Sequence, residues 1–399
     1  MVNAINILCD EDVLLAADQS EIKLKNMFQQ YYRTWEAGDV DLISSREIGF
    51  IPFFGSMIRH RAVLNLNSLS IFARKNVPRH MYYSSAYYRR PEEKVMLEKQ
   101  WLGAELIFDL DADHLAGADR MTYSQILGEV KRHTERLVFK FLMDDLGFQE
   151  KDLKLFFSGG RGYHVHVVED SVYPLSSDSR REIANYIRGE GFNPIDVKRS
   201  MQETSDRLDG WKLLIDREIM NFYRNLEQDS DKMEELHKVL GNSRTLSAYM
   251  NNLKKSTNMP DGLRKIDLFS KPGSLKYRHM DQNDDKVLLY VLQRVKTENQ
   301  CEIDEPVTTD THRLIRMPNS LHGKTGLRVK SININDFKDF DPLKETTVPQ
   351  FSATEIPVNL LRDYSIKLGG NSYNLEMGET TIPGDVAVFL VAGKIAKFI

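Results

Sequence analysis

The stretch Glu105-Leu-Ile-Phe-Asp-Leu-Asp-Ala-Asp113 begins apolar and ends in three aspartates. Successive side chains of a β-strand point to opposite faces, so Asp109, Asp111 and Asp113 would share one face while the apolar residues between them pack on the other. Like charges this close are costly unless a cation neutralises them, and carboxylate oxygens suit Mg²⁺ or Mn²⁺. The pattern predicts a divalent metal site, although a solvated acidic turn after a strand would look the same.

A second motif, Phe156-Phe-Ser-Gly-Gly-Arg-Gly-Tyr-His-Val-His-Val167, predicts two strands joined by a glycine-rich turn. Such a turn lets backbone N–H groups and the Ser158 hydroxyl approach an anion closely, and Arg161 adds a planar donor group suited to phosphate. We interpret it as half of a triphosphate pocket. Alternatively, the segment is an ordinary hairpin. Its glycines would then serve only to allow positive φ, and His164 and His166 would be surface residues that have hydrogen-bond partners.

The segment between these motifs relates them in space. Apolar residues recur at helical spacing from Thr122 to Leu146, and Gly147 closes the run. A crossover helix of this length would place the strand 153–157 parallel to the carboxylate strand in the same sheet. Both motifs would then lie at one edge of that sheet, as a shared metal and phosphate site requires.

A third motif makes the chain recognisable. The segments 108–111 (Phe-Asp-Leu-Asp), 158–164 (Ser-Gly-Gly-Arg-Gly-Tyr-His) and 313–326 (Arg-Leu-Ile-Arg-Met-Pro-Asn-Ser-Leu-His-Gly-Lys-Thr-Gly) stand in this order. Together they resemble the three motifs of the small, catalytic subunit of the archaeal and eukaryotic DNA primase. The resemblance runs from Arg46-Glu47 to about Gly326. It is specific because it needs three ordered motifs.

The resemblance implies a set of site residues. Two divalent ions, Mg²⁺ or Mn²⁺, would be held by Asp109, Asp111 and a third carboxylate near the segment 302–310. Asp304 and Asp310 compete for that place, and the separation from the Ser-Leu-His segment favours Asp304. The phosphates of the nucleotide would be held by five residues: Ser158, Arg161, His164, His322 and Lys324.

The resemblance also implies a function. The chain would be a nucleotidyltransferase, a DNA-directed RNA polymerase that makes short RNA primers from NTPs on a single-stranded DNA template for replication. It would work in the cytoplasm as a heterodimer with the primase large subunit. Two other functions remain open: a stand-alone primase-polymerase or repair polymerase that uses dNTPs, and an inactive nucleic-acid-binding subunit.

Composition is compatible with such an enzyme. The chain has 399 residues, of which 41% are hydrophobic, and a net charge of −4 that argues against a uniformly basic DNA-coating protein. The N-terminus lacks a signal-peptide pattern, and no apolar run reaches membrane-spanning length. Two cysteines, Cys9 and Cys301, are too few for a Cys₄ zinc or iron–sulfur site. The family's cysteine-type zinc module is therefore expected to be missing.

The predicted fold class is α/β (α+β), a primase-type mixed-sheet core with an inserted, mainly helical subdomain. The core would comprise residues 1–173 and 298–399, and the insertion residues 174–297. Helical patterns dominate the insertion, at 179–188, 205–227, 231–240, 244–254 and 284–295. An amphipathic helix is expected over Glu21–Ala37, followed by two β segments about Gly55. Towards the C-terminus we expect β structure at 302–310, strands at 327–334, 366–368 and 386–391, and a short helix near 357–363.

Overall fold

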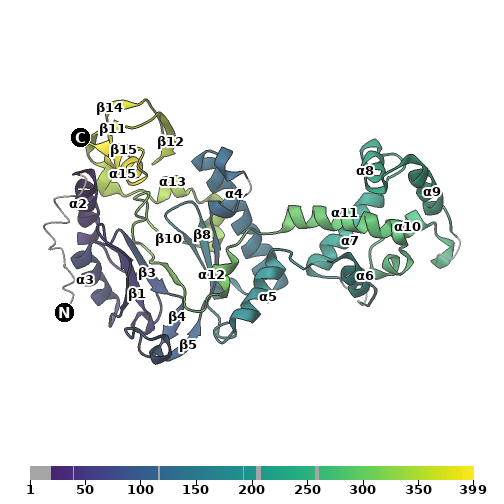
Figure 1. Ribbon diagram of the computed structural model, residues 1–399, viewed down its shortest axis with the longest axis horizontal. Coiled ribbons are helices and arrows are strands. Elements are labelled where there is room, and N and C mark those ends of the chain that lie inside the picture. Colours follow the sequence, from purple (N-terminus) through teal and green to yellow (C-terminus); the bar gives the residue numbers. More distant parts are fainter. Residues whose placement is uncertain (1–18, 39, 116, 192, 204–207, 257–259) are drawn as a thin grey trace, which may run out of the picture. The chain divides into compact units, whose positions relative to one another are not determined.

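The computed structural model of the chain describes residues 19–399, except 39, 116, 192, 204–207 and 257–259 (Figure 1). Cys9 and the start of the helix expected from Ser205 lie outside the described residues. The chain divides into two compact units: the first comprises Met1–Glu135, Gln149–Ala184 and Glu302–Ile399, and the second Arg136–Phe148 and Asn185–Cys301. Helices combine with several small, mainly antiparallel sheets, which confirms the predicted α/β class.

One sheet of the first unit brings together segments distant in the sequence. Its strand order is β2 (Ile58–Arg61), β1 (Ile48–Ile51), β3 (His80–Ser84) and β9 (Leu314–Arg316), all antiparallel. The helices α2 (Gln19–Arg33) and α3 (Leu66–Asn76) lie beside β1 and β3 (Figure 1). Helix α2 buries Leu24, Phe28 and Tyr32, which recur every four residues, as the helical pattern predicts.

The second sheet carries both motifs. Its order is β10 (Lys330–Ile332), β7 (Leu153–Phe157), β8 (Tyr163–Val167) and β6 (Leu106–Leu110). Strands β6 and β7 are each antiparallel to β8, which lies between them, so they run parallel to each other as predicted. The end of β6 and the turn after β7 therefore meet at one edge of the sheet.

The expected crossover helix is present, but its second half is a π-helix. Helix α4 (Tyr123–Glu135) passes into a π-helix at Arg136–Asp145, where the chain leaves the first unit. A further helix, α5 (Ser177–Ile187), begins in the first unit.

Three sequence-based assignments in the C-terminal third were wrong. The expected β structure at 302–310 is the helix α12 (Glu305–Thr309), whose first turn holds Pro306, a position where the fixed φ of proline suits a helix. The expected strand 386–391 is the helix α15 (Gly384–Ala392), buried all round, and periodicity cannot separate such a run from a buried strand. The expected helix near 357–363 is the strand β11 (Glu355–Leu360), whose residues alternate between exposed and buried.

Strand β11 belongs to a small C-terminal sheet with β14 (Gly378–Pro383) and β15 (Ala396–Phe398). Helix α15 packs against this sheet and against α2. Two further two-stranded sheets, one of β4 (Ala86–Tyr88) with β5 (Trp101–Ala104) and one of β12 (Tyr364–Leu368) with β13 (Asn371–Leu375), complete the β structure of the described residues.

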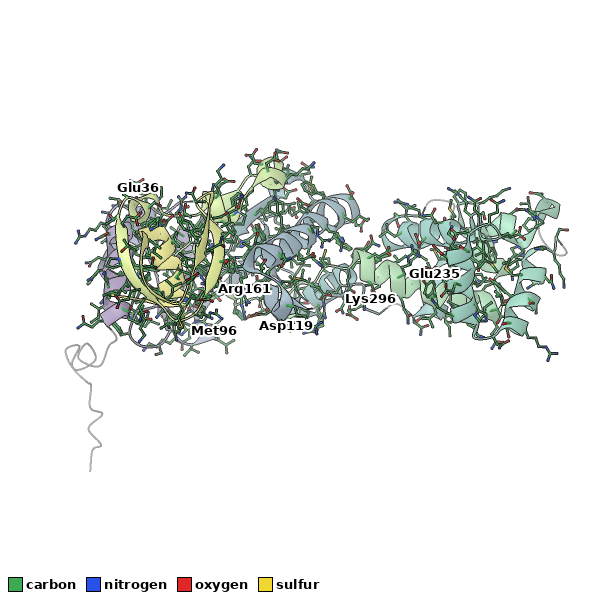
Figure 2. The ribbon with its side chains drawn as sticks, turned by 90° about the horizontal axis from the view of Figure 1, so that it is seen from above. Glu36, Met96, Asp119, Arg161, Glu235 and Lys296 are labelled. Atoms are coloured by element: carbon green, nitrogen blue, oxygen red, sulfur yellow. The ribbon has the colours of Figure 1, made fainter. Side chains whose placement is uncertain are left out.

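The second unit is helical. Its described helices include α6 (Pro194–Glu203), α7 (Gly210–Tyr223), α8 (Ser230–Leu240), α9 (Ser243–Leu253), α10 (Lys265–Phe269) and α11 (Gln282–Asn299). The sequence pattern missed α6 and α10. This unit also takes in Arg136–Phe148 and begins at Asn185, whereas the prediction placed the insertion at 174–297. Figure 2 labels Glu235 and Lys296 on this unit, and Arg161 and Met96 on the first.

None of the described helices is both long enough and apolar enough to cross a membrane.

Candidate active site

The strand β6 presents its carboxylates at the edge where it ends. Asp109 lies opposite His164 of β8 and is 23% exposed, while the neighbouring apolar residues of the strand are buried. Asp111 follows the strand in an extended conformation, and its carboxylate accepts a hydrogen bond from the Ala112 N–H at 2.6 Å. Asp113 lies in the next turn, is 70% exposed, and pairs with Arg161 at 2.5 Å.

The glycine-rich turn packs directly against the end of β6. A Cβ atom at Gly162 would lie 2.1 Å from the Leu110 carbonyl oxygen and 3.0 Å from the Asp111 Cα, so only glycine fits there. Gly159 has φ +77°, a conformation that side chains disfavour. Within the turn, the Ser158 hydroxyl accepts a hydrogen bond from the Gly160 N–H at 3.3 Å. The turn thus lies beside Asp111.

Two histidines of the site are buried and neutral. Burial, with His166 and Arg316 nearby, lowers the pKa of His164 well below its ordinary value, and burial together with Arg316 and His80 does the same to His322. The His164 Nε2 lies 3.5 Å from an Asp109 oxygen. Neutral imidazoles can donate one hydrogen bond each without adding charge.

These residues line one pocket of about 340 Å³, within the range of small-ligand sites. Asp109 and Asp111 contribute carboxylates, whereas Arg161, Lys324 and Arg316 contribute cations. Ser158, His164 and His322 also line it. The structure therefore brings seven of the eight predicted site residues together in one cavity. The eighth is Asp304, and all eight belong to the first unit.

Asp304 lies next to this pocket without lining it. It precedes α12, and its backbone N–H donates a hydrogen bond to the Asp109 carbonyl at 2.9 Å, so α12 is fixed beside β6. The negative charge of Asp304 contributes to raising the pKa of Asp109. Asp310 follows the other end of α12, is exposed, and accepts a hydrogen bond from the His312 N–H at 2.8 Å. Of the two candidates for the third carboxylate, Asp304 is the one that lies beside Asp109.

The electrostatics of Asp109 fit a cation site. Burial, with the negative charges of Asp111 and Asp304, raises the pKa of Asp109 to about 7. A divalent ion would supply the missing positive charge, and all three groups offer the oxygen ligands that Mg²⁺ or Mn²⁺ prefers. Among the described residues, no group of three or more acidic, histidine or cysteine side chains is already arranged to hold a metal ion.

The raised pKa of Asp109 predicts a pH-dependent stability without metal. A carboxyl group has a pKa near 3.9 in an unfolded chain. With a pKa of about 7 in the folded protein, the Asp109 carboxyl group makes its full contribution to stability below about pH 4. This contribution is lost as the pH rises through 7. Asp109→Asn should therefore be more stable than the wild type at pH 8, by about 1–4 kcal/mol, and nearly equal to it at pH 4.5. Urea unfolding in EDTA at both pH values measures this, and an equal difference at the two values would contradict it.

Buried ionic contacts hold the start of β6. Glu105 accepts hydrogen bonds from the Arg46 guanidinium and, at 3.0 Å, from the Tyr87 hydroxyl, and lies 2.9 Å from the His166 Nδ1. Although burial alone would raise its pKa, Arg46 and His166 hold the pKa of Glu105 at about 2. The buried guanidinium of Arg180 donates to the Glu105 carbonyl at 2.8 Å. This network fixes the strand that carries Asp109.

Comparison with known proteins identifies the family. Residues 108–334 match the DNA primase small subunit family. That span covers more than half of the chain and contains all eight predicted site residues. The chain belongs to this family.

Whole-chain similarity agrees with the family match. The DNA primase small subunit PriS of Picrophilus torridus is 44% identical over 94% of this chain and 98% of that protein. PriS of Thermoplasma volcanium is 38% identical over 95% and 98%, and PriS of Methanothrix thermoacetophila is 36% identical over 94% and 98%. The protein is thus a DNA primase catalytic subunit, and family membership implies a nucleotidyltransferase with a larger partner subunit and a DNA template.

The sequence reading assigned no role to three residues of the primase pocket. Arg316 ends β9, lies 2.8 Å from the His80 Nδ1 and stacks over the Tyr82 ring. The Tyr123 hydroxyl donates to the Gly160 carbonyl at 2.6 Å, and the Thr325 hydroxyl donates to the Gly159 carbonyl at 2.5 Å. Arg316 stood within the quoted Arg-Leu-Ile-Arg motif, where strand alternation could have separated its face from that of Arg313.

Proposed function

We propose that this chain synthesises short RNA primers from NTPs on single-stranded DNA by two-metal-ion nucleotidyl transfer. The observation that carries the proposal is one pocket lined both by the carboxylates Asp109 and Asp111, with Asp304 next to it, and by the cations Arg161, Arg316 and Lys324. Carboxylates suit divalent ions, and cations suit a triphosphate. A nucleotide bound through its phosphates and metal ions needs both kinds of group in one pocket.

The residues of the pocket would have two roles, metal binding and phosphate binding. Asp109, Asp111 and Asp304 would hold two Mg²⁺ or Mn²⁺ ions. When bound, such ions lower the pKa of the attacking hydroxyl and neutralise charge on the leaving group. Lys324 and Arg316 would bind phosphate oxygens as fixed positive charges, and Arg161 would exchange its exposed partner Asp113 for phosphate. Ser158 and the neutral His164 and His322 would donate hydrogen bonds to the same oxygens.

The proposed partners are single-stranded DNA, NTPs, the growing primer and the primase large subunit, and the proposed location is the cytoplasm. Purified protein, alone and with its large subunit, should be incubated with single-stranded template, labelled NTPs or dNTPs, and Mg²⁺ or Mn²⁺. Products begun without a primer from NTPs would support the proposal. Incorporation of dNTPs only onto a supplied primer would favour a repair polymerase, and no incorporation by either preparation would favour an inactive subunit.

A further inference from the structure

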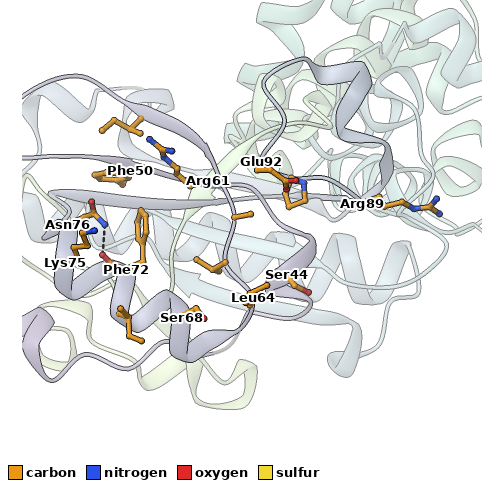
Figure 3. Close-up of a pocket in the computed structure, with 15 residues that line it drawn as sticks. Ser44, Phe50, Arg61, Leu64, Ser68, Phe72, Lys75, Asn76, Arg89 and Glu92 are labelled. Carbon is orange, nitrogen blue, oxygen red and sulfur yellow. Dashed lines mark hydrogen bonds between the residues drawn. The ribbon is translucent and has the colours of Figure 1, made fainter. Parts of the chain in front are cut away.

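A second cavity in the first unit has no part in the chemistry described above. It is an open groove of about 890 Å³ between α3, the strands β1 and β2, and the segment 89–92 (Figure 3). No residue lining it also lines the catalytic pocket. We call it the α3 groove, lined by Ser44, Phe50, Ile58, Arg61, Ala62, Val63, Leu64, Ser68, Ile71, Phe72, Lys75, Asn76, Arg89, Pro91 and Glu92.

Exposed apolar side chains are frequent in the part of the sequence that forms this groove. Ten of the nineteen large hydrophobic residues that are exposed in the described part of the chain fall between residues 42 and 102. Two of them line the α3 groove, Leu64 at 83% and Ile71 at 55% exposed. Exposed apolar side chains that line a groove together are typical of interaction surfaces.

The groove also carries unneutralised positive charge. Arg61, Lys75 and Arg89 are exposed, and none forms an ion pair within the part of the chain that the structure describes. Lys75 and Arg89 lie at opposite ends of the view in Figure 3. Glu92 is the one carboxylate among the lining residues. The complementary surface would therefore present apolar side chains flanked by carboxylates.

The side chains of the groove suit a protein better than a nucleic-acid strand. Single-stranded nucleic acids bind by stacking bases on exposed aromatic faces. The two aromatic residues of the lining, Phe50 and Phe72, pack edge to face on each other with ring centroids 5.2 Å apart, and Phe50 is buried. The accessible apolar groups are instead the aliphatic side chains of Leu64 and Ile71. Burial of such surface drives protein–protein association, and arginine is enriched at protein interfaces.

We propose that the α3 groove, with Leu64 and Ile71 at its centre, binds the large subunit of the primase through an apolar segment flanked by carboxylates. This inference rests on the proposed function, because that function requires such a subunit. The groove and the catalytic pocket share no lining residue, so a partner bound in the groove contacts a different set of side chains.

The test uses the full chain with the full-length large subunit. The double variant Leu64→Asp/Ile71→Asp should weaken binding at least about 100-fold in surface plasmon resonance, because it places charge at the apolar centre of the interface. Independently, Lys75→Glu/Arg89→Glu should weaken binding about tenfold or more, and less at high salt. Leu361→Asp, which changes an aliphatic residue that is 48% exposed elsewhere in the first unit, is the matched control and should bind normally.

Extension of a supplied primer by each variant alone should match that of the wild type, which also shows that the variants fold. Unchanged affinity of both groove variants for the large subunit would overturn the inference. So would loss of single-stranded DNA binding, or of self-association, with large-subunit affinity intact. If the wild-type complex binds normally but transfers no nucleotide, the proposed function fails while the docking site stands.

Discussion

Replacing Asp111 with Asn should reduce nucleotidyl transfer by at least about 1,000-fold, since two-metal sites contribute several kcal/mol to the reaction and each 1.4 kcal/mol is a factor of ten. The change removes one of two negative charges at the end of β6. It keeps an oxygen that can accept the hydrogen bond from the Ala112 N–H, so the turn after the strand should remain folded. Primer synthesis on single-stranded template at saturating NTP measures the effect.

Asp113→Asn is the matched control. Asp113 is two residues further on, is 70% exposed and pairs only with the exposed Arg161 among the described residues. Its replacement should change the rate by less than about tenfold, because an exposed ion pair contributes at most about 1 kcal/mol. Near-normal synthesis by Asp111→Asn, or equal losses in the two variants, would show that the carboxylates of β6 do not hold the catalytic ions.

Replacing Glu105 with Ala should lower the free energy of unfolding by about 3–5 kcal/mol, the usual cost of leaving one member of a buried ion pair without its partner. Arg46 and Glu105 are 1% and 3% exposed. Without Glu105, the guanidinium would keep only neutral acceptors, the Tyr87 hydroxyl and backbone carbonyls. Urea unfolding at pH 7, followed by far-ultraviolet circular dichroism, gives the difference.

An exposed ion pair serves as the control for the predicted effect of Glu105→Ala. Arg132 and Glu129 also form an ion pair, but Arg132 is 60% exposed. Glu129→Ala should therefore cost less than about 1 kcal/mol. The double replacement Arg46→Met/Glu105→Leu should recover part of the loss, since it removes both buried charges together. A cost for Glu105→Ala no larger than that for Glu129→Ala would mean that water reaches this network in solution.

The parts of the site that follow from the sequence are those set by strand geometry. Alternation along 106–111 and a crossover of the right length were enough to place Asp109, Asp111 and the turn at Ser158 on one sheet edge. Alternation could separate the face of Arg316 from that of Arg313, but it could not place Arg316 at the pocket. That position depends on the pairing of β9 with β3, two strands more than 200 residues apart.

Two of the three errors arose where local pattern and tertiary structure disagree, and the third overlooked a pattern that was present. The run Val386–Val391 is apolar on every side because α15 is buried on every side, so no period marks it as a helix. At 355–360 the alternation of Ile356, Val358 and Leu360 was visible in the sequence, and its period of two indicates the strand that is found. Helix α12 contains the β-branched residues Val307, Thr308 and Thr309, which are common in strands, yet here they belong to a helix that packs against β6.

The fit of Gly162 against the Leu110 carbonyl has a consequence for protein engineering. The distance between the proposed triphosphate-binding turn and the proposed metal-binding aspartates is set by this main-chain contact and not by the side chains that line the pocket. Directed evolution could therefore vary Arg161 or Lys324, the proposed phosphate ligands, to alter the affinity for nucleotide while the distance between the turn and the aspartates stays constant. A library that randomises position 162 itself should yield almost exclusively inactive clones.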